Sequence, residues 1–135
     1  MQKYDIRDLS LAPSGHQKIQ WVKNNMPLLR GLEEEFIKNK PFEGIKISLS
    51  VHLEAKTAYL CLVLAAGGAD MSVTGSNILS TQDDVAAALV DSGLKVFAYH
   101  GASPEEYEKH IEMTLEHKPN IIIDDGGDLV GLIHT

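Results

Sequence analysis

Three short polar segments carry the side chains most suited to chemistry, and each directly follows an apolar run. The segments are 52–57 (HLEAKT), 74–83 (TGSNILSTQD) and 124–128 (DDGGD). His52 in the first segment can act as a general acid or base, or can hold a carboxylate. In the third segment, flexible glycines let acidic side chains and backbone approach a ligand closely. A carboxylate there can hold a ribose hydroxyl pair, act as a base or bind Mg²⁺.

The first and third segments also have structural interpretations, and the residues alone leave both interpretations open. His52 could bond only to a nearby backbone group. Glu54 and Lys56 are two residues apart, so they do not share a helical face, and their spacing alone favours a solvated helix start. If both faced a ligand, one would accept and the other would donate hydrogen bonds. Capping of a following helix would account for either Asp124 or Asp128.

The second segment is first of all a helix-capping sequence. We expect Ser80 or Thr81 to be the N-cap, with an acidic residue three positions later. The functional alternative is an anion site, because free N–H groups at a helix N-terminus suit a carboxylate or phosphate, and Ser76 and Asn77 would add donors. The histidines and Cys61 lack metal-ligand spacing, so we expect no metal site and place Cys61 in the core.

The elements that must position these segments begin with a helical segment at 1–43. Its first 15 residues are expected to be irregular, and the amphipathic helix that follows is kinked or divided by Pro27 and ends near Pro41. From residue 44 to 135, strand and helix patterns alternate. Strands are predicted at 44–52, 69–73, 94–99 and 120–124, and helices at 54–66, from Thr81 to Gly93, and from Ser103 to near Pro119.

This alternation predicts an α/β fold, a three-layer, Rossmann-like parallel sheet with helices on both faces. The continuous apolar run at 120–124 predicts a buried strand. Ligands of such sheets bind beyond the carboxyl ends of the strands, so the three polar segments should meet along one edge. The last residues, LVGLIHT (129–135), look like the first turns of another helix, so we expect an incomplete domain.

Composition excludes some classes of protein. The 135 residues are 44% hydrophobic, and 12 lysines and arginines stand against 19 aspartates and glutamates, for a net charge of −7. This balance argues against sequence-independent nucleic-acid binding, which relies on a basic surface. No apolar run approaches the ~20 residues of a membrane span, and the start lacks a signal-peptide pattern. The single cysteine cannot form an intramolecular disulfide, so a cytoplasmic location is expected.

Three motifs, taken in order, resemble the adenosylhomocysteinase (S-adenosyl-L-homocysteine hydrolase) family over nearly the whole chain. The motifs are LAPSGHQKIQWVKNNMPLLR (11–30), GSNILSTQDDVAAAL (75–89) and IIIDDGGDLVGLIHT (121–135). The resemblance implies that residues 1–135 are the N-terminal part of the family's substrate-binding domain. It also suggests a homo-oligomer when the protein is full-length.

The resemblance further implies a mechanism. NAD⁺, held by a separate domain, oxidises the substrate's ribose 3′-hydroxyl; homocysteine leaves by elimination, water adds, and the 3′-ketone is reduced again. By motif position, Asp125 would contact the substrate and assist proton transfer. His52 would be an acid or base near the sulfur and the 5′ carbon. Asn77, Ser80 and Asp128 would line the homocysteine side.

The chain departs from the family pattern in two ways. No G-x-G-x-x-G occurs, so NAD would be bound by a domain outside this chain, and the 135 residues alone are expected to be inactive. Many members read His-x-Thr-x-Glu-Thr in the base-reading loop, where this chain has His52, Glu54, Lys56 and Thr57. A lysine only donates hydrogen bonds, which suits the 6-oxo group of hypoxanthine. The alternative substrate is therefore S-inosyl-L-homocysteine, with inosine as product, unless Glu54 recognises the adenine amine with Lys56 as its ion-pair partner.

Two further classes remain open. A receiver-like signalling module also alternates strands and helices with acids at strand ends, but it needs a later lysine that the chain does not supply after 121–125. A nucleoside-binding module without catalysis would fit the isolated chain. Phosphorylation by acetyl phosphate with Mg²⁺ would identify the former, and titration with adenosine or inosine tests the latter.

Overall fold

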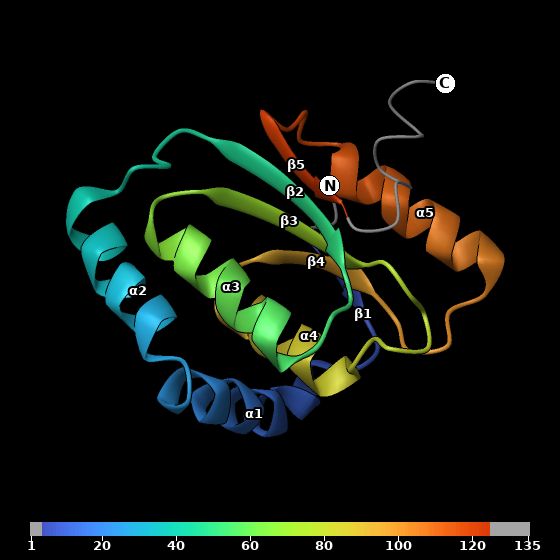
Figure 1. Ribbon diagram of the computed structural model, residues 1–135. Helices are drawn as coiled ribbons and strands as arrows, with labels where there is room; N and C mark the ends of the chain where they lie inside the picture. Colours follow the sequence, from blue (N-terminus) through green and yellow to red (C-terminus); the bar gives the residue numbers. More distant parts are fainter. Residues whose placement is uncertain (1–3, 125–135) are drawn as a thin grey trace.

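The computed structural model describes residues 4–124 and contains a five-stranded, wholly parallel sheet in the order β1-β4-β3-β2-β5 (Figure 1). The strands are β1 (Asp5–Ile6), β2 (Lys46–Val51), β3 (Asp70–Gly75), β4 (Lys95–Ala98) and β5 (Ile121–Asp124). The helices are the 3-10 turn η1 (Leu9–Leu11), α1 (Ala12–Asn24), α2 (Pro27–Asn39), α3 (Ala55–Ala66), α4 (Asp83–Asp91) and α5 (Pro104–Leu115).

The helices cover both faces of the sheet, which confirms the predicted α/β class. Helices α3 and α4 pack on one face and α5 packs on the other (Figure 1). Helices α1 and α2 form an additional outer layer, because α1 packs on α3 and α4, and α2 packs on α3. The helical segment at the start of the chain therefore covers the helices rather than the sheet.

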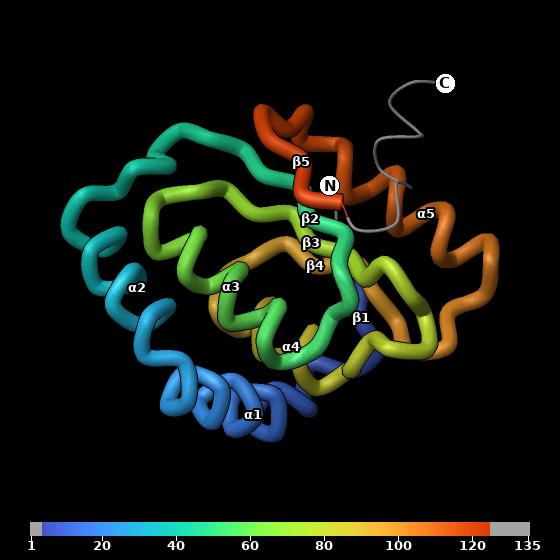
Figure 2. Tube along the Cα trace, in the orientation of Figure 1, coloured from blue at the N-terminus to red at the C-terminus, as the bar shows by residue number. Residues whose placement is uncertain are grey.

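The direction of the chain reverses at β2. From β2 it steps through α3 to β3 and through α4 to β4, and α5 then returns it to the far side of β2, where β5 pairs with it (Figure 2). In the register of that pair, Ser50 lies opposite Asp124. The gap between the carboxyl ends of β2 and β5 is thus the topological switch point, the place where open α/β sheets bind ligands.

The division of the first helical segment at Pro27 into α1 and α2 is confirmed. Two expectations for the elements need correction. The described part of the first 15 residues is not irregular, because Asp5 and Ile6 pair with β4 and α1 already begins at Ala12. The last strand is not fully buried: Ile121 is 41% exposed and the rest of β5 is half-buried, since β5 lies at an edge of the described sheet.

Gly15 lies where α1 packs closely against α4. A Cβ at this position would collide with the backbone carbonyl of Asp84 and would lie 2.8 Å from the Cβ of Ala88. Only glycine lets α1 approach α4 this closely. The glycine therefore serves a tertiary contact inside a helix and does not end one.

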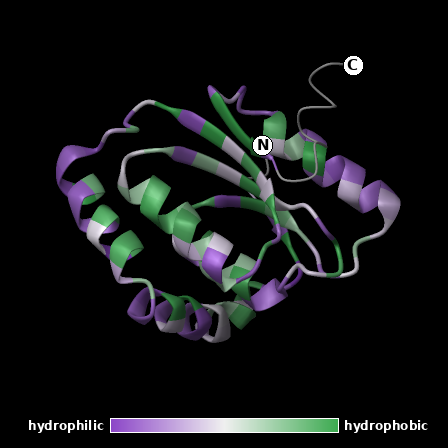
Figure 3. Ribbon diagram, viewed as in Figure 1, coloured by the Kyte–Doolittle hydropathy of each residue, from purple (hydrophilic) through white to green (hydrophobic). Residues whose placement is uncertain are grey.

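The main core lies between the sheet and the pair α3 and α4. Its most deeply buried aliphatic side chains include Ile47, Leu49, Val73, Val85, Leu89 and Val96. Figure 3 shows α3 largely in the hydrophobic colour, whereas α1 is mixed. Cys61 is in this core as predicted, and burial raises the pKa of its thiol to about 12. Within residues 4–124, the structure contains no helix that combines the length and the apolar character of a membrane span.

Candidate functional site

A cavity of about 720 Å³ opens beside the carboxyl end of β2. Four parts of the chain line it: α1, the segment after β2, residues 79–84 at the start of α4, and His100 after β4. Its lining side chains are Lys18, His52, Glu54, Leu79, Ser80, Thr81, Gln82, Asp83, Asp84 and His100. The first two polar segments therefore meet along one edge, as parallel strands require.

His52 and Ser80, both proposed from the sequence, are in direct contact. The Nδ1 atom of His52 lies 2.7 Å from Oγ of Ser80. The same Ser80 hydroxyl donates a hydrogen bond to the backbone carbonyl of Asn77 at 3.1 Å. The structure thus brings together three of the candidate residues in a single hydrogen-bonded chain.

The loop that carries Ser80 is fixed from several sides. The Thr81 hydroxyl donates to the carbonyl of Asn77 at 3.1 Å, and the side-chain oxygen of Asn77 accepts the amide N–H of Leu79 at 2.8 Å. Further along, the Gln82 amide donates to the carbonyl of Leu53. These contacts overturn the expected capping: Gln82, not Ser80 or Thr81, is the N-cap of α4, and it makes no side-chain cap bond. Both hydroxyls donate to the carbonyl of Asn77 inside their own loop.

Glu54 caps α3. Its carboxylate accepts the backbone N–H of Thr57 at 3.0 Å, and the Thr57 hydroxyl lies 3.4 Å from the same oxygen. An acidic residue at this position is favoured by the free N–H groups and the positive end of the helix dipole. Thr57 is buried beneath this cap. The structural interpretation of Glu54 is therefore realised, although Glu54 also lines the cavity.

Lys56 is exposed and stands apart from His52. It lines a second, smaller hollow of about 330 Å³, formed between α1 and the start of α3 with Trp21, Val22 and Gln82. Glu54 borders both hollows. Segment 52–57 thus presents His52 and Lys56 to two adjoining hollows, and the Glu54 carboxylate borders both.

Sequence reasoning missed Lys18 and His100. Lys18 reaches from α1 to Asp84, with Nζ 2.8 Å from Oδ2, and donates to the side-chain oxygen of Gln82. Burial alone would raise the pKa of Asp84, but hydrogen bonds from Lys18 and Ser14 hold it below its usual value. Nothing in the helical pattern of α1 marks Lys18, because its partner is 66 residues away.

His100 follows β4 after one intervening residue, Tyr99. This place near the carboxyl end of a strand is the feature of the sequence that could have identified it as a site residue. Its Nδ1 lies 2.8 Å from the carbonyl of Thr81, which only accepts, so this nitrogen carries the proton. Its backbone N–H donates to the Asp83 carboxylate at 2.9 Å. His100 therefore ties the end of β4 to the start of α4 at the cavity wall.

The structure describes only the first residue of the third polar segment, Asp124. Asp124 ends β5, is half-buried and pairs in register with Ser50. Asp125 and Asp128, and the helix expected after them, lie outside the described residues. Ser76 follows β3, and its carbonyl accepts the Tyr107 hydroxyl at 3.3 Å.

Within residues 4–124, no group of three or more His, Cys, Asp or Glu side chains is arranged to hold a metal ion.

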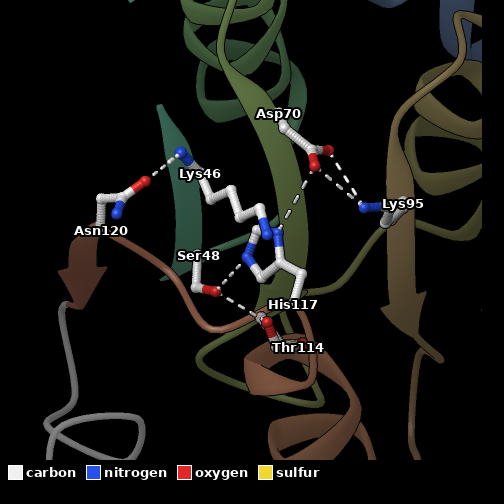
Figure 4. Close-up of polar contacts among 7 residues, drawn as sticks. All are labelled: Lys46, Ser48, Asp70, Lys95, Thr114, His117 and Asn120. Carbon is white, nitrogen blue, oxygen red and sulfur yellow. Dashed lines mark hydrogen bonds and ion pairs between the residues drawn. The ribbon is translucent and has the colours of Figure 1, made fainter. Parts of the chain in front are cut away.

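A separate polar cluster lies at the opposite edge of the sheet, near the amino ends of β2, β3 and β4 (Figure 4). His117 is at its centre, with Nε2 2.8 Å from the Ser48 hydroxyl and Nδ1 3.9 Å from the Asp70 carboxylate. Asp70 also binds Nζ of Lys95 at 3.1 Å. The cluster joins α5 to the sheet and is remote from the cavity at the carboxyl edge.

Another network, in which only His110 is buried, anchors the N-terminal strand. The carboxylate of Asp5 accepts a hydrogen bond from the Tyr99 hydroxyl and lies 3.0 Å from Nε2 of His110, which is 2% exposed. Arg7 lies over the Tyr99 ring, 4.8 Å from its centre. Burial and the hydrogen bond to Asp5 raise the pKa of Tyr99 to about 12. A strand of two residues is thus held by side chains.

Comparison with known proteins gives consistent matches along the chain. It is 53% identical over 131 residues to a protein named S-inosyl-L-homocysteine hydrolase from Methanococcus maripaludis, covering 97% of this chain and 32% of that protein. It is also 53% identical over 132 residues to an adenosylhomocysteinase from Pyrococcus abyssi, covering 98% and 31%. An adenosylhomocysteinase from Gloeothece citriformis is 50% identical over 132 residues, covering 97% and 31%.

The chain thus spans about a third of the length of the curated relatives that it matches. The model of a single family, described as S-adenosyl-L-homocysteine hydrolase, matches residues 3–135. Because that match takes in nearly every residue, including all three polar segments, the chain belongs to the S-adenosyl-L-homocysteine hydrolase family.

Proposed function

We propose that the protein containing this chain reversibly hydrolyses S-adenosyl-L-homocysteine to adenosine and L-homocysteine, and that residues 1–135 are the N-terminal part of its substrate-binding domain. The observation that carries the proposal is the position of His52. It lies at the carboxyl end of β2, beside the switch point and on the wall of the cavity, held by Ser80 at 2.7 Å. An imidazole in this position is suited to move protons on a ligand bound at that edge.

In this proposal His52 supplies the proton that leaves with the homocysteine sulfur and removes one from the water that adds at the 5′ carbon. The polar groups of Ser76, Asn77 and Ser80, on the loop after β3, lie toward the homocysteine side. Asp125 and Asp128 complete the site, with Asp125 assisting proton transfer. The half-buried position of Asp124 opposite Ser50 supports this assignment, because the next residue along the chain follows the end of β5.

The family's NAD does not fit the described residues. In dinucleotide-binding folds the pyrophosphate lies at the N-terminus of the helix that follows the strand at the switch point, against a glycine-rich loop. Here that helix is α3, and the Glu54 carboxylate already accepts the Thr57 N–H at its N-terminus. A second negative group would be repelled there. The proposal therefore assigns NAD to a part of the protein outside this chain, and expects the 135 residues alone to be inactive.

S-inosyl-L-homocysteine is the second candidate substrate, and Lys56 favours it. The lysine offers three N–H donors and no acceptor, which matches the 6-oxo group of hypoxanthine better than the amine of adenine. Glu54, the nearest acceptor in the loop, is engaged by the backbone of α3. The relatives named for the two substrates are equally similar to this chain, so they favour neither substrate.

The experiment is a pair of steady-state assays on the full-length protein supplied with NAD⁺. Homocysteine release from S-adenosyl- and S-inosyl-L-homocysteine is followed with a thiol reagent, and the two kcat/KM values are compared. Replacement His52→Asn should lower kcat by about 100-fold or more, the range expected for loss of a general acid or base. Release from neither substrate would refute the proposed hydrolysis. Light scattering on the same protein tests the proposed homo-oligomer.

A further inference from the structure

We infer that Ser80 is a positioning residue for His52, which fixes the ring with its proton on Nδ1 and so makes Nε2 the nitrogen that exchanges protons with the substrate. The catalytic consequence of this inference rests on the proposed function, whereas the hydrogen-bond geometry stands without it. It reassigns Ser80 from the substrate-contacting role suggested by its motif to a role that acts through His52. Two distances carry it: 2.7 Å from Ser80 Oγ to His52 Nδ1, and 3.1 Å from Ser80 Oγ to the Asn77 carbonyl.

The single hydroxyl proton of Ser80 determines which group donates in the hydrogen bonds that link His52, Ser80 and Asn77. The Asn77 carbonyl can only accept, so the 3.1 Å contact requires the Ser80 proton to lie between the two oxygens. Were that proton turned toward His52, two acceptor oxygens would face each other at 3.1 Å with no hydrogen between them. Ser80 Oγ must then accept from His52, and Nδ1 is the protonated nitrogen.

The loop around Ser80 is rigid enough to impose this geometry. Thr81 is 2% exposed, and its hydroxyl donates to the same Asn77 carbonyl. The Gln82 amide binds the carbonyl of Leu53, the residue directly after His52. The two loops that carry Ser80 and His52 are thus joined through their backbones as well as through the two side chains. His52 itself is exposed, so a directed hydrogen bond restrains its ring more than packing does.

The chemical consequence concerns which ring nitrogen of His52 accepts and donates the proton of the reaction. A neutral imidazole has one donor and one acceptor nitrogen, and a hydrogen bond at one of them sets the role of the other. With Nδ1–H held by Ser80, Nε2 is the basic atom in one orientation. Without Ser80, Nδ1 loses the acceptor that selects this tautomer, and misplacement of a reacting group by about 1 Å can lower a rate about 100-fold.

The test is ¹⁵N NMR of protein labelled at histidine nitrogens, with the His52 signals assigned by comparison with His52→Gln. In the parent protein Nδ1 should resonate as a protonated nitrogen and Nε2 as an unprotonated one at a pH where the ring is neutral. Ser80→Ala should replace this pattern by averaged or reversed signals, whereas Ser80→Thr, which retains the hydroxyl, should preserve it. Leu79→Ala is the matched control, since Leu79 neighbours Ser80 and is 71% exposed.

Unchanged His52 signals in Ser80→Ala, or an equal change in Leu79→Ala, would overturn the inference. In the full-length enzyme, Ser80→Ala should lower kcat about 10- to 100-fold with a smaller change in KM, and Ser80→Thr should restore most of it. A loss confined to KM would instead assign Ser80 to substrate contact. If the parent protein hydrolyses neither substrate while the NMR result holds, the proposed function fails and the positioning by Ser80 stands.

Discussion

The imidazole of His117 bonds to the hydroxyl of Ser48 across the edge of the sheet, with Nε2 and Oγ 2.8 Å apart (Figure 4). Ser48 donates its own proton to the carbonyl of Thr114, so Nε2 of His117 is the donor in this pair. Nδ1 is buried, has no hydrogen-bond partner within the described residues and lies 3.9 Å from the Asp70 carboxylate. Burial lowers the pKa of His117, and the nearby Lys95 lowers it further, against the opposing charge of Asp70.

The first prediction is that His117 makes the protein less stable in mild acid. Its pKa is lower in the folded chain than in the unfolded chain, so the unfolded chain binds the proton more readily. The contribution of His117 is therefore fully present above the ordinary histidine pKa of about 6.5 and declines as pH falls through the window toward the folded pKa.

This prediction is checked by urea unfolding at several pH values between neutrality and mild acid, for the parent protein and for His117→Gln. Carboxylates titrate in both proteins, so the informative quantity is the difference between the two pH profiles. The parent should lose more free energy of unfolding on acidification than the variant does. Parallel profiles would show that His117 does not titrate in this way. His16→Gln is the control, because its partner Asp91 is 58% exposed and the pair is on the surface.

The second prediction concerns the contact between α1 and α4. Gly15→Ala should destabilise the fold by about 1–3 kcal/mol, the usual cost of overpacking, because the added Cβ meets the backbone of Asp84. Gly31→Ala is a matched control in α2, where nothing lies within 4 Å of the added Cβ. It should stabilise by about 0.5–1 kcal/mol through helix propensity. Thermal unfolding of the two variants should therefore shift Tm in opposite directions, and equal shifts would contradict this account of Gly15.

The third prediction concerns the anchor of β1. Tyr99→Phe removes the hydroxyl that donates to Asp5 and should cost about 0.5–1.5 kcal/mol, the usual net value of one hydrogen bond, because the contact of Asp5 with His110 remains. Tyr4→Phe, at a residue that is 40% exposed, should change the free energy of unfolding little. Hydrogen exchange provides the local measurement: the β1 amides should lose protection in Tyr99→Phe and not in Tyr4→Phe. Equal protection in both would mean that pairing with β4 alone holds β1.

The fourth prediction concerns recognition of the base in the full-length protein. Lys56→Glu should raise the ratio of kcat/KM for the adenosyl substrate over the inosyl substrate by about 10-fold or more, because an acceptor replaces a donor. Lys109→Glu, an exposed change of the same charge on α5, should leave the ratio unchanged. If Lys56→Glu also leaves it unchanged, Lys56 does not read the base.

The order and type of the elements could be predicted from sequence because local signals determine them. Period-two apolar residues mark β2, and Ser103 followed by Pro104 marks the start of α5, where the structure shows Ser103 as the N-cap in a capping box with Glu106. The predictions of elements fail where tertiary contacts, and not local sequence, determine the structure. A strand of two residues has no period, and Gly15 is typical of an irregular segment unless its packing against α4 is known.

The candidate site was predictable in part for the same reason. Strand polarity is enough to bring His52 and Ser80 to one edge. It could not show that the Ser80 hydroxyl would bond to His52 and Asn77 instead of capping α4. Nor could it find Lys18, which reaches the cavity from α1, because its partner is distant in sequence. His100 could have been found from its place at the carboxyl end of β4.

The Glu54 carboxylate stands at the border of two hollows while it holds the Thr57 amide. Any molecule that draws this carboxylate toward itself competes with the first turn of α3 for it. By thermodynamic reciprocity, whatever loosens that turn frees the carboxylate, and whatever captures the carboxylate loosens the turn. The hydrogen exchange rate of the Thr57 amide should therefore rise when a ligand binds the Glu54 carboxylate, so this rate reports ligand binding at the two hollows.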